Sequence, residues 1–174
     1  CILKYLHICM LSSLGSDVPF FLRGGTAIAE GRGEEVHELP HMPTVHLVLL
    51  APPADIPNKT ATMFGHLTPE HYTDGEACLR LRRCLQNGKR PSGKLLFNAF
   101  EGVAFDLFPT LKDCRRAMLN AGASWVRLTG SGPALYTFVA SRGKALALAE
   151  RLREGGYEVY VASTVEPPPG EMLL

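Results

Sequence analysis

The chain has 174 residues, of which 46% are hydrophobic and 20% charged, with a formal net charge of +1. This length suffices for one sizeable domain, or for one domain and part of another, and the absence of a basic run argues against a nucleic-acid partner. Five cysteines without a Cys-x-x-Cys pair argue against a zinc site or a disulfide framework and favour a reducing, cytoplasmic setting. The apolar stretch 2–14 is too short to span a bilayer, so no membrane partner is expected.

The first predicted elements are a helix and a β-hairpin, joined by the run LGSDVPFFLRGGTA at residues 14–27. Pro19 lacks an N–H group and disfavours helix at the residue before it, so the helix is expected to end near Asp17. A carboxylate held at such a junction suits a general base, although a helix-end residue without chemistry fits as well. Apolar–polar alternation around the glycines at 31 and 33 then predicts strands at 26–29 and 35–39.

The remaining elements alternate between helices and short apolar strands. A buried strand is expected at 44–51, and two further strands flank a glycine-rich run at 129–133, before a last strand at 157–162. The expected helices cover residues 59–66, 74–86, 96–106, 110–120 and 143–153. This order predicts an α+β fold, an antiparallel sheet with helices on one face.

The glycine-rich run contains Gly130, Ser131 and Gly132 between two apolar segments. Glycines let backbone N–H groups approach an anion closely, and a neighbouring hydroxyl adds a donor. The same residues also occur in ordinary hairpin turns, so this run alone leaves both interpretations open.

Taken together, the motifs resemble the GHMP kinase superfamily, and within it they are most similar to the 4-diphosphocytidyl-2-C-methyl-D-erythritol kinase family. The run at 14–27 matches the family's Asp-Val-Pro block, and the resemblance continues through GRGE at 31–34, NAFE at 98–101 and GSG at 130–132. The family's ATP-binding glycine loop precedes the Asp-Val-Pro block and has no counterpart in these residues. The resemblance therefore implies the C-terminal part of a kinase. Its expected divisions are a remnant of the N-terminal domain (1–43), the GHMP-kinase C-terminal domain (44–166) and a tail (167–174).

The resemblance also implies a reaction, the phosphorylation by ATP of the 2-hydroxyl of 4-diphosphocytidyl-2-C-methyl-D-erythritol in non-mevalonate isoprenoid (terpenoid) biosynthesis. The implied cofactors are ATP and Mg²⁺, with no metal ligand assigned, and the isolated chain is expected to be inactive. Asp17 takes the part of the base, and Gly130, Ser131 and Gly132 form the phosphate loop. Thr60 and Phe64 are implied to bind substrate, with Phe64 stacking on the cytosine.

Several alternatives stay open at this point. The preceding Lys59 departs from the family's pattern, which weakens the assignment of Thr60, and Phe64 could instead be a core aromatic residue. The chain could derive from another GHMP kinase, of the homoserine or mevalonate type, or be a non-catalytic binding or interaction module. Other residues are expected to have structural roles: the histidines at 37, 41 and 46, the basic residues at 80, 82, 83, 90 and 94, and Trp125 in the sheet core.

Overall fold

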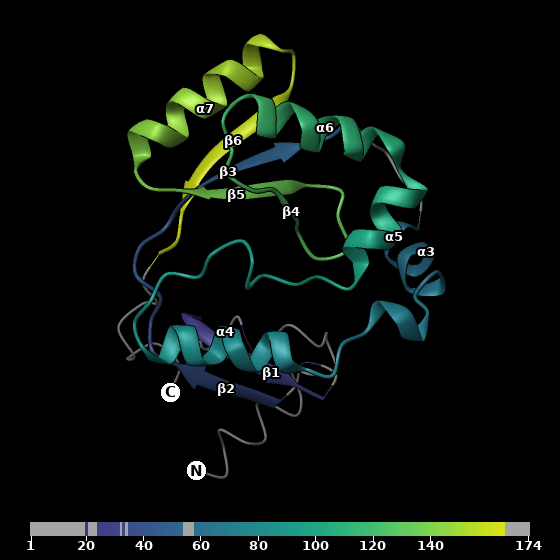
Figure 1. Ribbon diagram of the computed structural model, residues 1–174, viewed down its shortest axis with the longest axis vertical. Coiled ribbons are helices and arrows are strands. Elements are labelled where there is room, and N and C mark those ends of the chain that lie inside the picture. The colour runs from purple at the N-terminus through teal and green to yellow at the C-terminus, as the bar shows by residue number, and fades with distance from the viewer. Residues whose placement is uncertain (1–19, 21–23, 32, 34, 54–57, 166–174) are drawn as a thin grey trace, which may run out of the picture. The chain divides into compact units, whose positions relative to one another are not determined.

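The structure, a computed structural model, describes residue 20 and the ranges 24–31, 33, 35–53 and 58–165. It divides into two compact units, residues 1–44, 82–90 and 165–174 in one and residues 45–81 and 91–164 in the other (Figure 1). In the first unit, β1 (Thr26–Glu30) pairs antiparallel with β2 (Glu35–Leu39). This confirms the expected hairpin, while Asp17 lies outside the described residues. The expected division at residues 43 and 166 stays a prediction.

The second unit is built on an antiparallel four-stranded sheet. Its strands are β3 (His46–Ala51), β4 (Arg127–Leu128), β5 (Leu135–Val139) and β6 (Glu158–Ser163), in the spatial order β4-β5-β3-β6. Leu50 of β3 lies opposite Leu135 of β5 and Val159 of β6, and all three are buried. Because paired residues in a sheet point to the same face, this register gives the sheet one continuous apolar face.

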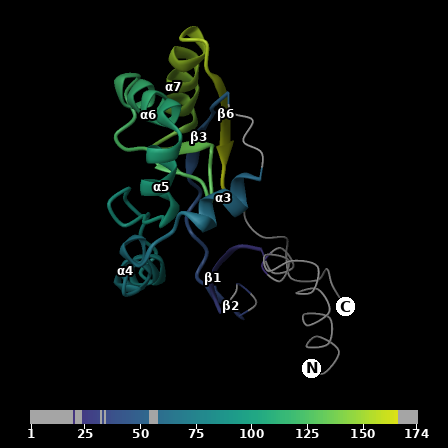
Figure 2. The ribbon, with the colours of Figure 1, turned by 90° about the vertical axis from the view of Figure 1, so that its right-hand side faces the viewer.

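The helices are α3 (Lys59–Gly65), α4 (Glu76–Gln86), α5 (Phe100–Leu107), α6 (Pro109–Asn120) and α7 (Arg142–Glu154), with a short 3₁₀ helix, η1, at Pro69–His71. Figure 2 shows α5, α6 and α7 on one side of the sheet. The core there includes Met118 from α6 and Leu148 and Leu152 from α7. The expected α+β fold, with helices on one face of an antiparallel sheet, is confirmed. None of the described helices is long and apolar enough to cross a membrane.

The opposite face of the sheet is covered near β4 and β5 by an aromatic cluster and by the turn at residues 92–95. The Trp125 ring makes edge contacts with Tyr136 and Phe138, at centroid distances of 5.8 and 5.1 Å. The backbone of Gly93 lies against this ring so closely that a Cβ atom would overlap it. Arg127 adds two hydrogen bonds to the Gly93 carbonyl oxygen, at 3.2 and 2.9 Å from Nε and one Nη. Trp125 thus packs on the sheet, and the chain around Gly93 is tied to β4.

One helix begins later than the sequence indicates. The helix expected at 96–106 starts at Phe100 instead, because the Asn98 side chain accepts a hydrogen bond from the Phe100 N–H at 3.0 Å. Asparagine side chains compete with the helix backbone in this way and favour helix starts over helix interiors. The apolar residues at 95–97 have the pattern of a helical turn, although they lie outside α5. The predicted start of this helix was therefore wrong.

Candidate functional site

The candidate site is centred on the glycine loop, residues 129–133, which joins β4 to β5. The loop closes through hydrogen bonds from Thr129 N to the Ala134 oxygen at 2.9 Å and from Gly132 N to the Thr129 oxygen at 2.7 Å. Gly132 has a φ of 80°, and a Cβ atom there would lie 2.9 Å from Leu128 Cδ1. A side chain at this position would strain the backbone and crowd β4, so the conformation of the loop depends on glycine.

Asn98 connects the loop to the start of α5. Its Nδ2 atom donates to the carbonyl oxygens of Gly130, at 2.8 Å, and Leu128, at 3.1 Å. Its Oδ1 atom accepts from Phe100 N, as described above. Only one orientation of the amide serves all three backbone groups, so Asn98 fixes both the loop and the first turn of α5.

The beginning of α3 supplies polar side chains to the same loop. Lys59 Nζ donates to the Gly132 carbonyl oxygen, and Thr60 Oγ1 lies 3.5 Å from Ser131 Oγ. One ammonium group and two hydroxyl groups therefore meet at the loop, a set of donors that suits a phosphate. The structure brings together Thr60, Gly130, Ser131 and Gly132, all singled out in the sequence. Lys59 was not predicted as a site residue, because its contact with the Gly132 oxygen joins segments that lie far apart in the sequence.

Phe64 lies one helical turn beyond Thr60 on α3. Its side chain is 59% exposed, and its ring meets that of Phe100 edge-on at a centroid distance of 4.9 Å. The alternative that Phe64 is a core aromatic residue is therefore wrong. An exposed ring held by a second aromatic residue leaves a face open for stacking, and stacking on cytosine stays a prediction.

The described part of the site fits a phosphate better than a metal ion. Mg²⁺ is bound mainly through carboxylates and phosphate oxygens, and the loop contacts described above involve no carboxylate. Among the residues that the structure describes, no group of three or more histidine, cysteine, aspartate or glutamate side chains could hold a metal. No metal ligand is assigned.

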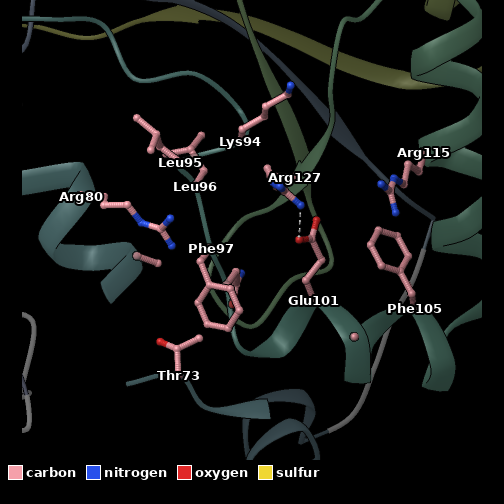
Figure 3. Close-up of a pocket in the computed structure, with 13 residues that line it drawn as sticks. Thr73, Arg80, Lys94, Leu95, Leu96, Phe97, Glu101, Phe105, Arg115 and Arg127 are labelled. Carbon is pink, nitrogen blue, oxygen red and sulfur yellow. Dashed lines mark hydrogen bonds and ion pairs between the residues drawn. The ribbon is translucent and has the colours of Figure 1, made fainter. Parts of the chain in front are cut away.

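A separate cavity of about 540 Å³ lies in the same unit, beside α5 (Figure 3). At its wall, Arg127 and Glu101 form an ion pair at 2.8 Å, with 27% and 14% of their side chains exposed. Burial raises the pKa of the neighbouring Tyr136 hydroxyl. The Arg127 charge acts to lower this pKa, and the Glu101 charge acts to raise it. Arg80 and Lys94 were expected on solvated surfaces. Both are exposed, but they also line this cavity, together with Arg115.

The family model described as "GHMP kinases C terminal" matches residues 80–158. The chain therefore contains a GHMP kinase C-terminal domain, and the matched range includes α5, α6, α7, β4 and β5. A homoserine kinase from Cytophaga hutchinsonii shares the fold, with a TM-score of 0.63 at 20% identity over 86% of this chain and 50% of the kinase.

Within this class, the chain is similar to kinases that share one name. The chain is 44% identical over 157 residues to a protein of Dehalococcoides mccartyi strain BAV1 named 4-diphosphocytidyl-2-C-methyl-D-erythritol kinase, covering 90% of this chain and 55% of the relative. The kinase of that name from Enterococcus faecalis is 33% identical, over 92% and 56% of the two chains. A crystal structure of 4-(cytidine 5'-diphospho)-2C-methyl-D-erythritol kinase matches with a TM-score of 0.71 at 32% identity, over 90% and 56%. The chain spans about half the length of the curated relatives it matches.

Proposed function

We propose that this chain is part of a cytoplasmic kinase that transfers a phosphoryl group from ATP to the 2-hydroxyl of 4-diphosphocytidyl-2-C-methyl-D-erythritol, in isoprenoid biosynthesis. The relatives named for this activity support the substrate, since their similarity covers nine-tenths of the chain.

One observation carries the proposal, the meeting of Lys59, Thr60 and Ser131 at a glycine loop whose shape is fixed by Asn98. Phosphoryl-transfer enzymes work mainly by positioning the substrate and neutralising charge. The ammonium group and one hydroxyl at the start of α3, with the Ser131 hydroxyl of the loop, serve both purposes for a diphosphate. The loop would therefore hold the diphosphate of the substrate and orient the erythritol hydroxyl for transfer.

The other assigned residues complete this arrangement. Phe64 would stack on the cytosine, since stacking requires only an aromatic face. Asp17 would accept or orient the proton of the 2-hydroxyl, a task for which an ionised carboxylate is suited. Mg²⁺, when bound with ATP, neutralises charge on the transferred phosphoryl group.

A chimaera tests the proposal, with the matched 55% of the Dehalococcoides kinase replaced by this chain. We expect turnover of 4-diphosphocytidyl-2-C-methyl-D-erythritol with ATP at roughly 1–100 per second. Homoserine and mevalonate, the substrates of the alternative kinases, should not be phosphorylated. A well-folded chimaera that phosphorylates homoserine or mevalonate in preference would contradict the proposed substrate. A folded chimaera with no activity, beside an active parent, would favour a binding module.

A further inference from the structure

The cavity beside α5 is distinct from the glycine loop and has the size of a small-molecule site. Its volume of about 540 Å³ lies within the usual range for ligand pockets. Its wall comes from the segments around Thr73 and Arg80, from residues 94–98, and from α5 and α6. Neither Lys59 nor the glycine loop contributes to this lining.

Positive charge dominates the cavity wall. Four cationic side chains face one carboxylate, that of Glu101, and Arg127 is fully engaged with Glu101 and the Gly93 carbonyl. Lys94 and Arg115 have no carboxylate partner among the residues that the structure describes. Arg80 has only an exposed partner, Glu76, at 3.7 Å. Three cationic side chains are thus available to a ligand, so the cavity favours an anionic ligand.

The available charges are spread along the cavity rather than gathered at one point. Figure 3 shows Arg80 and Arg115 on opposite sides of the Glu101–Arg127 pair. The Arg115 guanidinium lies over the Phe105 ring, with its Cζ atom 5.2 Å from the ring centroid. This contact uses the flat face of the guanidinium group, so the N–H groups at its edge remain able to donate to a ligand. A ligand with several linked anionic groups matches this spacing better than a single phosphate.

A further feature describes the rest of the ligand. The Phe97 side chain is 51% exposed at the cavity, and its ring offers a stacking surface. Glu101 Oε1 is shielded from the cavity and has no hydrogen-bond partner among the residues that the structure describes, so Glu101 serves Arg127 rather than the ligand.

We propose that this cavity binds a nucleoside di- or triphosphate, at a second site that does not depend on the glycine loop. The phosphates bind to Arg80, Lys94 and Arg115, and the base stacks on Phe97. Asn98 lines the cavity and also holds Gly130, so the bound nucleotide contacts the residue that fixes the loop.

Isothermal titration calorimetry of the 174-residue chain with ATP, and with inorganic tripolyphosphate, tests this site. We expect ATP to bind, and the double variant Arg80→Gln/Arg115→Gln to lower the affinity about 100-fold, since hydrogen bonds to charged groups are strong. Phe97→Leu should lower ATP affinity about tenfold and leave tripolyphosphate unaffected. Arg116→Gln is the matched control, because Arg116 pairs with Asp113 and does not line the cavity. Unchanged thermal unfolding of the variants verifies their folding.

Three results would overturn the proposal. The first is no ATP binding at millimolar concentration. The second is ATP binding that Lys59→Gln abolishes and the double arginine variant does not, which places the nucleotide at the glycine loop. The third is equal affinity for ATP and tripolyphosphate with no effect of Phe97→Leu, which removes the nucleoside from the assignment.

Discussion

The amide nitrogen of Asn98 lies 2.8 Å from the carbonyl oxygen of Gly130, although 32 positions separate the two residues in the sequence. The amide oxygen of the same side chain caps the first turn of α5. One residue therefore couples the position of the candidate phosphate loop to that of a core helix. The shape of the loop is set by the folded domain before any ligand binds.

Replacing Asn98 by aspartate tests this coupling. The variant Asn98→Asp keeps the acceptor for Phe100 N but replaces the donor to Gly130 and Leu128 with a carboxylate oxygen that repels both carbonyls. We expect a loss of about 2–3 kcal/mol in the free energy of unfolding, measured by urea denaturation. Asn87→Asp makes the same chemical change at an exposed hydrogen bond to the Arg83 oxygen and should cost about 1 kcal/mol or less. Equal losses in the two variants would contradict the assigned role of Asn98.

The Glu101–Arg127 ion pair should be worth more than an exposed pair. The variant Glu101→Ala leaves a half-buried guanidinium without its carboxylate, and we expect a loss of about 2 kcal/mol. Asp106→Ala removes the partner of Lys112 in an exposed pair at 3.3 Å, and should cost less than about 1 kcal/mol. Chemical denaturation of both variants gives the two free energies of unfolding. A similar small loss in each would show that solvent screens the Glu101–Arg127 pair as well.

Two glycine-to-alanine changes should have opposite effects on the melting temperature. In Gly93→Ala, the new Cβ atom overlaps the Trp125 ring, and we expect a loss of about 1–3 kcal/mol as the aromatic cluster shifts. In Gly143→Ala, the Cβ atom meets nothing within 4 Å inside α7, and alanine favours the helix by about 0.5–1 kcal/mol. If Gly93→Ala melts at or above the wild-type temperature, the chain at 91–97 does not pack on Trp125.

The described cysteines should differ in reactivity toward alkylating agents. Cys114 is buried in α6, and burial, followed by the neighbouring Asp113 charge, raises the pKa of its thiol. The thiol therefore stays protonated and unreactive at neutral pH, whereas Cys78 is exposed on α4. We expect iodoacetamide to modify Cys78 at least about tenfold faster than Cys114, as followed by peptide mass spectrometry. Comparable rates would mean that α6 is not packed as described.

Local patterns were sufficient to predict most of the fold. The glycines at 31 and 33 marked the hairpin turn, Gly122 marked the end of α6, and alternating apolar residues identified the sheet strands. The start of α5 was misplaced, because the capping by Asn98 depends on a side-chain hydrogen bond that hydrophobic periodicity does not record.

The site was predictable only in part. The glycine loop and Thr60 were recognised by motif, but Lys59 was not, because its contact with Gly132 joins segments 73 positions apart. The cavity was missed entirely. Its cations, Arg80, Lys94 and Arg115, stand on separate segments of the chain, and each alone resembles an ordinary solvated side chain.

The central claim is that the Lys59 ammonium group and the glycine loop hold the diphosphate of the substrate. Steady-state kinetics of Lys59→Gln in the chimaera with the Dehalococcoides kinase tests it most directly, with Lys112→Gln as the control for loss of a lysine away from the loop. The account predicts a KM for 4-diphosphocytidyl-2-C-methyl-D-erythritol raised about tenfold or more by Lys59→Gln, since a charge-assisted hydrogen bond is lost. The control should be unchanged. An unaltered KM and kcat in Lys59→Gln would contradict the claim.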